Sequence, residues 1–90
     1  MYCGVVIGRV VSTNKFDSLK NKKLMIVRRM NHDWQLMDES TEIVAVDSIG
    51  AGIGEWVIYA TGSSARAVFG ESASGIDAAI VGIIDPNEQG

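Results

Sequence analysis

Hydrophobic residues gather in short runs along the chain, and polar or glycine-rich stretches separate these runs. Five of the runs are rich in β-branched or aromatic residues, which favour strands, and they cover residues 4–13, 24–30, 43–47, 55–60 and 78–84. Gly4 and Gly8 interrupt the first run, and glycines inside a strand often mark a bulge or a tight bend at a barrel corner. The last run is apolar throughout and predicts a buried strand, which Pro86 ends.

The segments between these runs are polar or rich in turn-forming residues. They include polar connections, a glycine loop and a short helix, expected at residues 14–23, 31–42, 48–54 and 62–68. No segment of helical period is long enough for a core helix. Five strands and one short helix therefore predict an all-β fold, a small β-barrel that is OB-like in its strand count. We expect a single domain over residues 1–90, with a polar tail at 86–90.

The composition supports a folded domain with a modest core. The chain has 90 residues, of which 47% are hydrophobic and 21% are charged, and this balance argues against disorder. A domain of this size is often helped by self-association. No apolar run approaches the roughly 20 residues that span a bilayer, and no signal peptide is evident. With a single cysteine, Cys3, and no metal-ligand spacing, the simplest compartment is a reducing cytoplasm.

Charge divides unevenly along the chain. Residues 1–29 hold seven of the eight basic residues and one acid, a net charge of +6, whereas residues 30–90 hold Arg66 and ten acids, a net charge of −9. A basic face over residues 20–29 of an OB-like barrel could bind single-stranded nucleic acid. Such sites stack bases on exposed aromatic side chains, and the second predicted strand has none. The alternative is charge placed for assembly, which steers pairing between complementary surfaces.

No group of residues predicts catalysis. His32 lies in a polar turn, Cys3 is interpreted as a small buried strand residue, and neither has a partner nearby in the sequence. Asp47 and Glu55 flank the glycine loop, where capping the loop and opening the next strand explain them better than acid–base chemistry. The loop reads G-x-G-x-G before a strand, which fits no dinucleotide-binding motif. We therefore expect a protein that is not an enzyme, with no cofactor and no metal.

Four blocks of sequence carry a resemblance to a known family. They are Gly8–Lys15 with Ser18–Leu19 and Lys23–Val27, Ala45–Gly52 with Glu55–Val57, Gly62–Arg66, and Ile76–Asp85. In this order they resemble the pentameric vertex proteins of bacterial microcompartment shells, the ethanolamine-utilisation and carboxysome vertex family. The resemblance implies a five-stranded barrel that forms a cyclic homopentamer, caps the vertices of a polyhedral shell, contacts hexameric shell proteins and has no catalytic role. The run Lys22–Arg29 is closer to metabolosome members than to carboxysome members.

Two sets of residues are expected to serve assembly if the resemblance holds. The glycine loop is expected near the fivefold axis, where small residues let five chains converge; an ordinary tight hairpin is the alternative. Its residues are Ser48, Ile49, Gly50, Ala51, Gly52, Ile53 and Gly54. Charged contacts with neighbouring subunits or tiles are expected at Lys22, Lys23, Arg28, Arg29, Asp47 and Arg66. Arg66 can pair with a carboxylate such as Asp47 or Asp77, within or between subunits.

Overall fold

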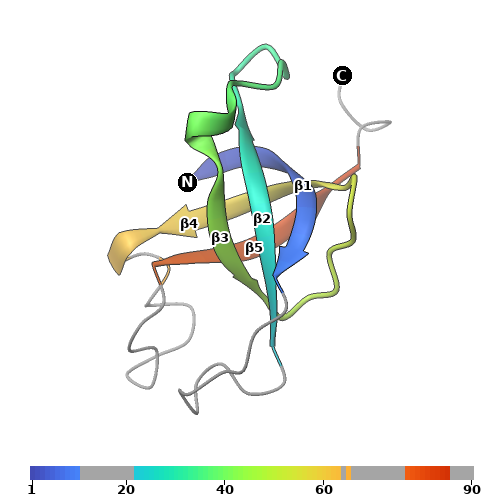
Figure 1. The fold of residues 1–90 in the computed structure, drawn as a ribbon, viewed down its shortest axis with the longest axis vertical. Coiled ribbons are helices and arrows are strands. Elements are labelled where there is room, and N and C mark those ends of the chain that lie inside the picture. The colour runs from blue at the N-terminus through green and yellow to red at the C-terminus, as the bar shows by residue number, and fades with distance from the viewer. Residues whose placement is uncertain (11–21, 64, 66–76, 86–90) are drawn as a thin grey trace.

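The computed structural model describes residues 1–10, 22–63, 65 and 77–85, and within them five strands close into one barrel (Figure 1). The strands are β1 (Tyr2–Val10), β2 (Lys23–Met30), β3 (Ile43–Asp47), β4 (Trp56–Thr61) and β5 (Ala78–Ile84). Their order around the barrel is β1-β2-β3-β5-β4, and β4 pairs with β1 to close it. Every neighbouring pair is antiparallel except β3 and β5. The prediction of a small five-stranded all-β barrel is confirmed.

The strand bounds follow the sequence pattern closely. β3 and β5 have the predicted bounds, β2 and β4 differ by one residue, and β1 begins two residues early, at Tyr2. The helical assignment begins at Gly62, while most of the expected helix and the tail at 86–90 lie outside the described residues. A 3₁₀ turn, η2 (Glu39–Thr41), was not predicted. Within the described part of the chain, no helix is long and apolar enough to cross a membrane.

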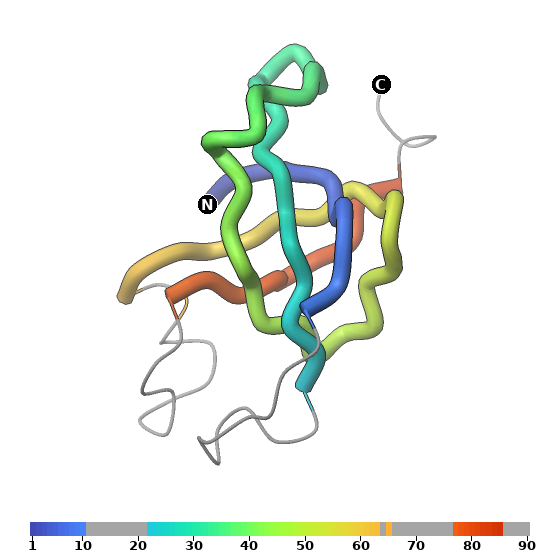
Figure 2. Tube along the Cα trace, viewed as in Figure 1, coloured from blue at the N-terminus to red at the C-terminus, as the bar shows by residue number. Residues whose placement is uncertain are grey.

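The barrel interior is filled by alternate residues of the strands, because successive side chains of a strand point to opposite faces. Val6, Val27 and Val57 are completely buried, and the same cluster includes Tyr59 and Ile80. Figures 1 and 2 show β2 and β3 crossing β4 and β5, with β1 curving between the two layers. The side chains of both layers therefore meet in one core.

A second apolar cluster lies on the outer face of the sheet. Val46, Ala60 and Ala79 are buried there together with Ala65, which belongs to the helical start after β4. Each of the three strand residues is the sequence neighbour of a residue in the interior cluster, so its side chain points outward. The start of the helix thus covers this part of the barrel, and small residues let it approach the strands closely.

The two glycines of β1 have different structural roles. The pairing of β1 with β2 passes from Val6↔Val27 to Gly8↔Ile26, so Ile7 is an extra residue and the predicted bulge lies beside Gly8. At Gly4 an added Cβ would lie 2.6 Å from the carbonyl oxygen of Arg28. Gly4 therefore permits a close approach of β1 to β2, which no other residue could accommodate without displacing them.

Candidate functional site

The glycine loop between β3 and β4 is held in place by the carboxylate of Asp47. Its Oδ1 accepts hydrogen bonds from the backbone N–H groups of Ile49 (3.0 Å) and Gly50 (3.2 Å), and its Oδ2 accepts one from Ala51 (2.8 Å). The Asp47 side chain is buried, with 2% of the residue exposed. The prediction that Asp47 caps the loop is confirmed, and its carboxylate is occupied within its own chain.

Glu55 holds the second half of the loop. Its Oε1 accepts a hydrogen bond from the backbone N–H of Gly52 at 2.6 Å. Gly50 and Gly54 have φ angles of 95° and 91°, a region that favours glycine. Asp47 and Glu55 thus shape a loop rather than forming an acid–base pair.

The glycine loop presents apolar side chains outward. Ile53 is 67% exposed and Ile49 is 46% exposed, whereas Ala51 is buried between them. The loop also pairs with β1, because Gly54 N–H donates to the carbonyl of Val6 (2.7 Å) and Val6 N–H donates to that of Glu55 (3.0 Å). A rigid loop with two exposed isoleucines is suited to contact another protein surface.

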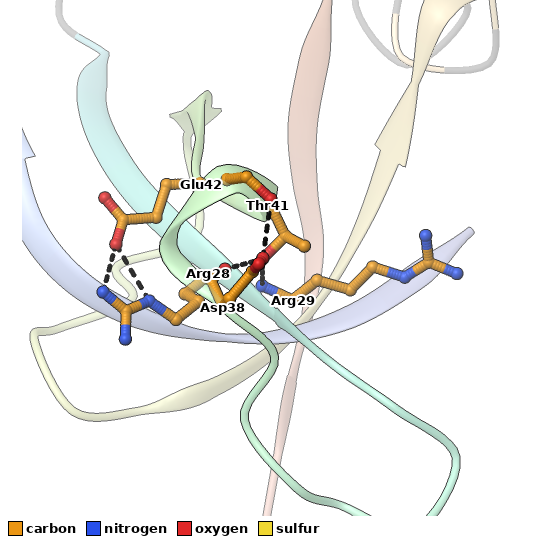
Figure 3. Close-up of polar contacts among 6 residues, drawn as sticks. Arg28, Arg29, Asp38, Thr41 and Glu42 are labelled. Atoms are coloured by element: carbon orange, nitrogen blue, oxygen red, sulfur yellow. Dashed lines mark hydrogen bonds and ion pairs between the residues drawn. The ribbon is translucent and has the colours of Figure 1, made fainter.

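The basic residues of β2 do not form one continuous face. Arg28 points outward and forms an ion pair with Glu42, with Arg28 Nε 2.8 Å from Glu42 Oε2 (Figure 3). Arg29 points away from that pair, and its guanidinium carbon lies 4.0 Å from the centre of the Tyr2 ring. Lys23 lies at the opposite end of the strand and is exposed. This separation does not support nucleic-acid binding by a single basic face. Another basic residue expected to serve assembly, Arg66, lies outside the described residues.

The partner of Arg28 was missed by sequence reasoning, although a signal for it exists. Lys23 pairs with Asp47 and Val27 pairs with Ile43 in the antiparallel register of β2 and β3. Continuing this register places Arg28 opposite Glu42. Opposite charges facing each other across two predicted strands would have indicated the pair once the register was assumed.

A loop of residues 31–37 projects from one end of the barrel (Figure 2). The Asn31 side-chain oxygen accepts hydrogen bonds from the N–H groups of Asp33 (2.9 Å) and Gln35 (3.0 Å). Trp34 has a φ of 62° and stacks on Trp56 of β4, with ring centres 5.3 Å apart. The stack was not predicted, because the two residues come from distant parts of the sequence.

The titratable residues that sequence analysis set aside remain without catalytic partners in the described part of the chain. The side chain of His32 is 92% exposed, which confirms the prediction of a solvated turn residue. Cys3 lies in β1 as expected, but its free thiol is half-buried rather than buried. Among the described residues, no three His, Cys, Asp or Glu side chains gather where they could hold a metal ion.

A hollow of about 260 Å³ opens between β1, β2 and β4, beside Arg29. Its lining includes Tyr2, Tyr59 and Thr61, along with Thr41 and Ile43. Burial raises the pKa of Tyr59 above its ordinary value of 10.0, and the nearby Arg29 charge opposes that rise. No sequence motif indicated this hollow.

Comparison with known proteins places these features in a family. The family model described as "Ethanolamine utilisation protein EutN/carboxysome" matches residues 1–85. The microcompartment shell vertex protein GrpN of Rhodospirillum rubrum is 52% identical over 88 residues, covering 98% of this chain and 97% of GrpN. PduN of Salmonella typhimurium, also a microcompartment shell vertex protein, is 51% identical and covers 94% of this chain and 96% of PduN.

A carboxysome relative and a solved structure extend the comparison. The carboxysome shell vertex protein CcmL of Nostoc is 40% identical, covering 94% of this chain and 83% of CcmL. The structure of GrpN, described as a pentameric microcompartment shell protein, superposes with a TM-score of 0.76 and 48% identity. That superposition covers 94% of this chain and 93% of the GrpN chain.

Proposed function

This chain belongs to the EutN/carboxysome family of shell vertex proteins, and from that membership we infer that it is a structural, non-catalytic shell protein. It forms homopentamers that cap the vertices of a bacterial microcompartment. The observation that carries this function is the match over residues 1–85 together with the shared barrel of a pentameric relative. Its place is therefore the microcompartment shell.

The shell is that of a metabolosome rather than a carboxysome. GrpN and PduN, both above 50% identity, carry the name of microcompartment shell vertex proteins. The carboxysome relative CcmL of Nostoc is 40% identical. Sequence proximity supports the assignment, and identification of the enzymes enclosed by a purified shell would test it.

The glycine loop, residues 48–54, lies near the fivefold axis of the pentamer. Two features support this placement: the loop is held rigidly by Asp47 and Glu55, and it exposes Ile53. Arg9 and Lys23 border a hollow of about 200 Å³ beside the same loop. In a ring of five copies, these loops and their basic neighbours would converge.

Substitution of Ile53 tests this placement without disturbing the core. Ile53→Lys changes an exposed side chain, and five new ammonium groups close to the axis, beside Arg9 and Lys23, would repel one another and weaken the ring. Leu36→Lys is a matched control, because Leu36 is an exposed apolar residue in the projecting loop. We expect only Ile53→Lys to lower the pentamer fraction, and salt to restore it. A ring as stable as the native one at low salt would place the loop elsewhere.

Charged contacts connect the subunit to its neighbours and to hexameric shell proteins. The contact residues were expected to be Lys22, Lys23, Arg28, Arg29, Asp47 and Arg66. Arg28 and Asp47 each have a partner within the chain. They therefore contribute to assembly by holding the subunit surface in its conformation. Lys23 and Arg29 carry the intermolecular charge contacts, because no ion pair within the described residues occupies them.

Mass measurement of the native protein tests the function as a whole. We expect a pentamer by native mass spectrometry, and weaker binding to hexameric shell proteins when Lys22, Lys23, Arg28 and Arg29 are reversed in charge. A monomer that binds oligonucleotides in a salt-sensitive way would contradict the shell assignment. Unchanged assembly and tile binding in the charge-reversed variant would contradict the role of these four residues.

A further inference from the structure

The neighbouring arginines of β2 have different electrostatic surroundings. Arg28 forms an ion pair with Glu42, the residue between the 3₁₀ turn η2 and the start of β3. Arg29 points the other way and has no carboxylate within ion-pair distance among the described residues; its guanidinium lies over the face of Tyr2 instead. A cation–π contact attracts the guanidinium but leaves its N–H groups available for other partners. Arg29 is thus a charge held in position, and no described residue uses the hydrogen-bonding capacity of its guanidinium.

Arg29 is fixed by its own backbone and by the aromatic rings beneath it. Its backbone N–H donates a hydrogen bond to the hydroxyl of Thr41 (3.2 Å), and that hydroxyl donates one to the backbone carbonyl of Asp38 (2.8 Å). The Tyr2 ring in turn packs against the Tyr59 ring, with centres 5.8 Å apart. The guanidinium therefore sits at the edge of the hollow on a rigid support, as a binding group requires.

The wall of the hollow offers a second polar group without a partner. Tyr59 is 2% exposed, and no hydrogen bond to its hydroxyl is found among the described residues. A buried hydroxyl is usually hydrogen-bonded, and leaving it unpaired costs free energy. Thr61 lines the same hollow, and its hydroxyl also has no hydrogen bond to any of the described residues.

We propose that this hollow binds a single carboxylate group, with the guanidinium of Arg29 and the hydroxyl of Tyr59 as donors and the Tyr2 ring and Ile43 as walls. A carboxylate fits because one guanidinium matches its charge and its planar, two-oxygen geometry. A phosphate dianion would leave charge uncompensated beside only one cation. The carboxylate belongs either to a small acid in solution or to an Asp or Glu side chain of another copy of this chain, whose residues 30–90 carry a net charge of −9.

Three variants separate this site from general charge effects. Arg29→Gln removes the cation, Tyr59→Phe removes only the hydroxyl, and Arg28→Gln is the matched control because its charge is already paired with Glu42. The first assay is ligand-observed NMR of the assembled protein with propionate, and with uncharged propionamide as the reference. The second assay is the protein concentration at which the assembly dissociates, with and without propionate.

Two results would support the proposal and distinguish the sources of the carboxylate. For a free acid, propionate but not propionamide binds, Arg29→Gln weakens binding about 10-fold or more, and Tyr59→Phe weakens it less. Propionate then leaves the dissociation concentration of the native assembly unchanged. For a neighbouring side chain, both variants raise the dissociation concentration, and propionate raises it in the native protein. In each case Arg28→Gln behaves like the native protein.

The proposal is wrong if propionate binds no better than propionamide and neither Arg29→Gln nor Tyr59→Phe changes dissociation. It is also wrong if Arg28→Gln has the same effect as Arg29→Gln, because that would show a general effect of charge. The pentameric mass of the native protein is measured separately, so failure of the carboxylate site leaves the shell function standing.

Discussion

Substitution of Gly4 by alanine tests the closest backbone approach in the barrel. A Cβ at this position would lie 2.6 Å from the carbonyl oxygen of Arg28 and 2.6 Å from Cγ1 of Val27, and 3.0 Å from Cε1 of Tyr59. Ordinary contacts of a Cβ begin near 3.4 Å. One of these atoms belongs to the backbone of β2, so rotation of a side chain cannot relieve the overlap. The two strands must move apart.

The position of β1 makes that movement costly. Gly4 pairs with Arg29 of β2 on one side and with Val57 of β4 on the other, so the strand cannot shift without disturbing two ladders. Overpacking of a core by a methyl group costs about 1–3 kcal/mol. Loss of glycine's freedom in the unfolded chain returns about 0.4–1 kcal/mol. Because a rigid carbonyl is involved, we place the overpacking cost near the top of its range, which leaves a net loss of about 2 kcal/mol after the return from the unfolded chain.

Urea denaturation at one fixed protein concentration measures this loss, since association makes the apparent stability depend on concentration. A loss of about 2 kcal/mol corresponds to a fall in melting temperature of roughly 8–16 °C for a domain of this size. Gly8→Ala is the matched control on the same strand, because its Cβ would lie 3.6 Å from the flexible Cδ1 of Ile26. Gly82→Ala is a second control, with nothing within 4 Å.

The free energies of unfolding of the three glycine variants, compared with one another, test the close approach of β1 to β2. Both controls are expected to leave the free energy of unfolding unchanged or to raise it by up to about 1 kcal/mol, because neither added Cβ clashes and the unfolded chain loses the freedom of glycine. If the stability of Gly4→Ala falls within about 0.5 kcal/mol of that of Gly8→Ala, then β1 and β2 can separate freely, and their close approach does not require glycine at position 4.

Three further predictions follow from other contacts. Asp47→Ala leaves three loop N–H groups without their acceptor, one of them in buried Ala51. It should lower the free energy of unfolding, measured in urea, by about 1–3 kcal/mol. An unchanged urea midpoint would show that Asp47 does not cap the loop. Trp34 has a φ of 62° and stacks on Trp56. Both Trp34→Gly and Trp34→Ala lose the stack, but only glycine adopts this φ without strain, so the glycine variant should be about 1 kcal/mol more stable than the alanine variant. Equal stabilities of the two variants would contradict this. Burial raises the pKa of Tyr59 above 10.0. Above pH 10 the unfolded chain therefore loses the Tyr59 proton before the folded protein does, and the free energy of unfolding falls as the pH rises further. If Tyr59→Phe lost the same stability at alkaline pH, Tyr59 would not be the cause.

Local pattern was sufficient to predict the strands and the cap of the glycine loop. β3 and β5 have the bounds expected from their apolar runs, and the bulge beside Gly8 was expected from the glycines of β1. Within the described residues, the hydrogen bonds that the Asp47 carboxylate accepts come from residues two to four positions further along the chain. Such features depend on side-chain alternation and on short-range geometry, which the order of residues specifies directly.

Contacts between distant residues were settled only when the barrel closed. The sequence shows two adjacent arginines in one basic segment, and nothing local indicates that Arg28 is neutralised by Glu42 while Arg29 is not. That difference arises because strand register sets which side chains face each other, and a shift of one residue exchanges the two faces of a strand. The hollow beside Arg29 likewise requires Tyr2 and Tyr59 to meet across β1 and β4. The chain by itself thus determined the barrel and its family, whereas closure of the barrel decided which charges are paired and which remain available to bind.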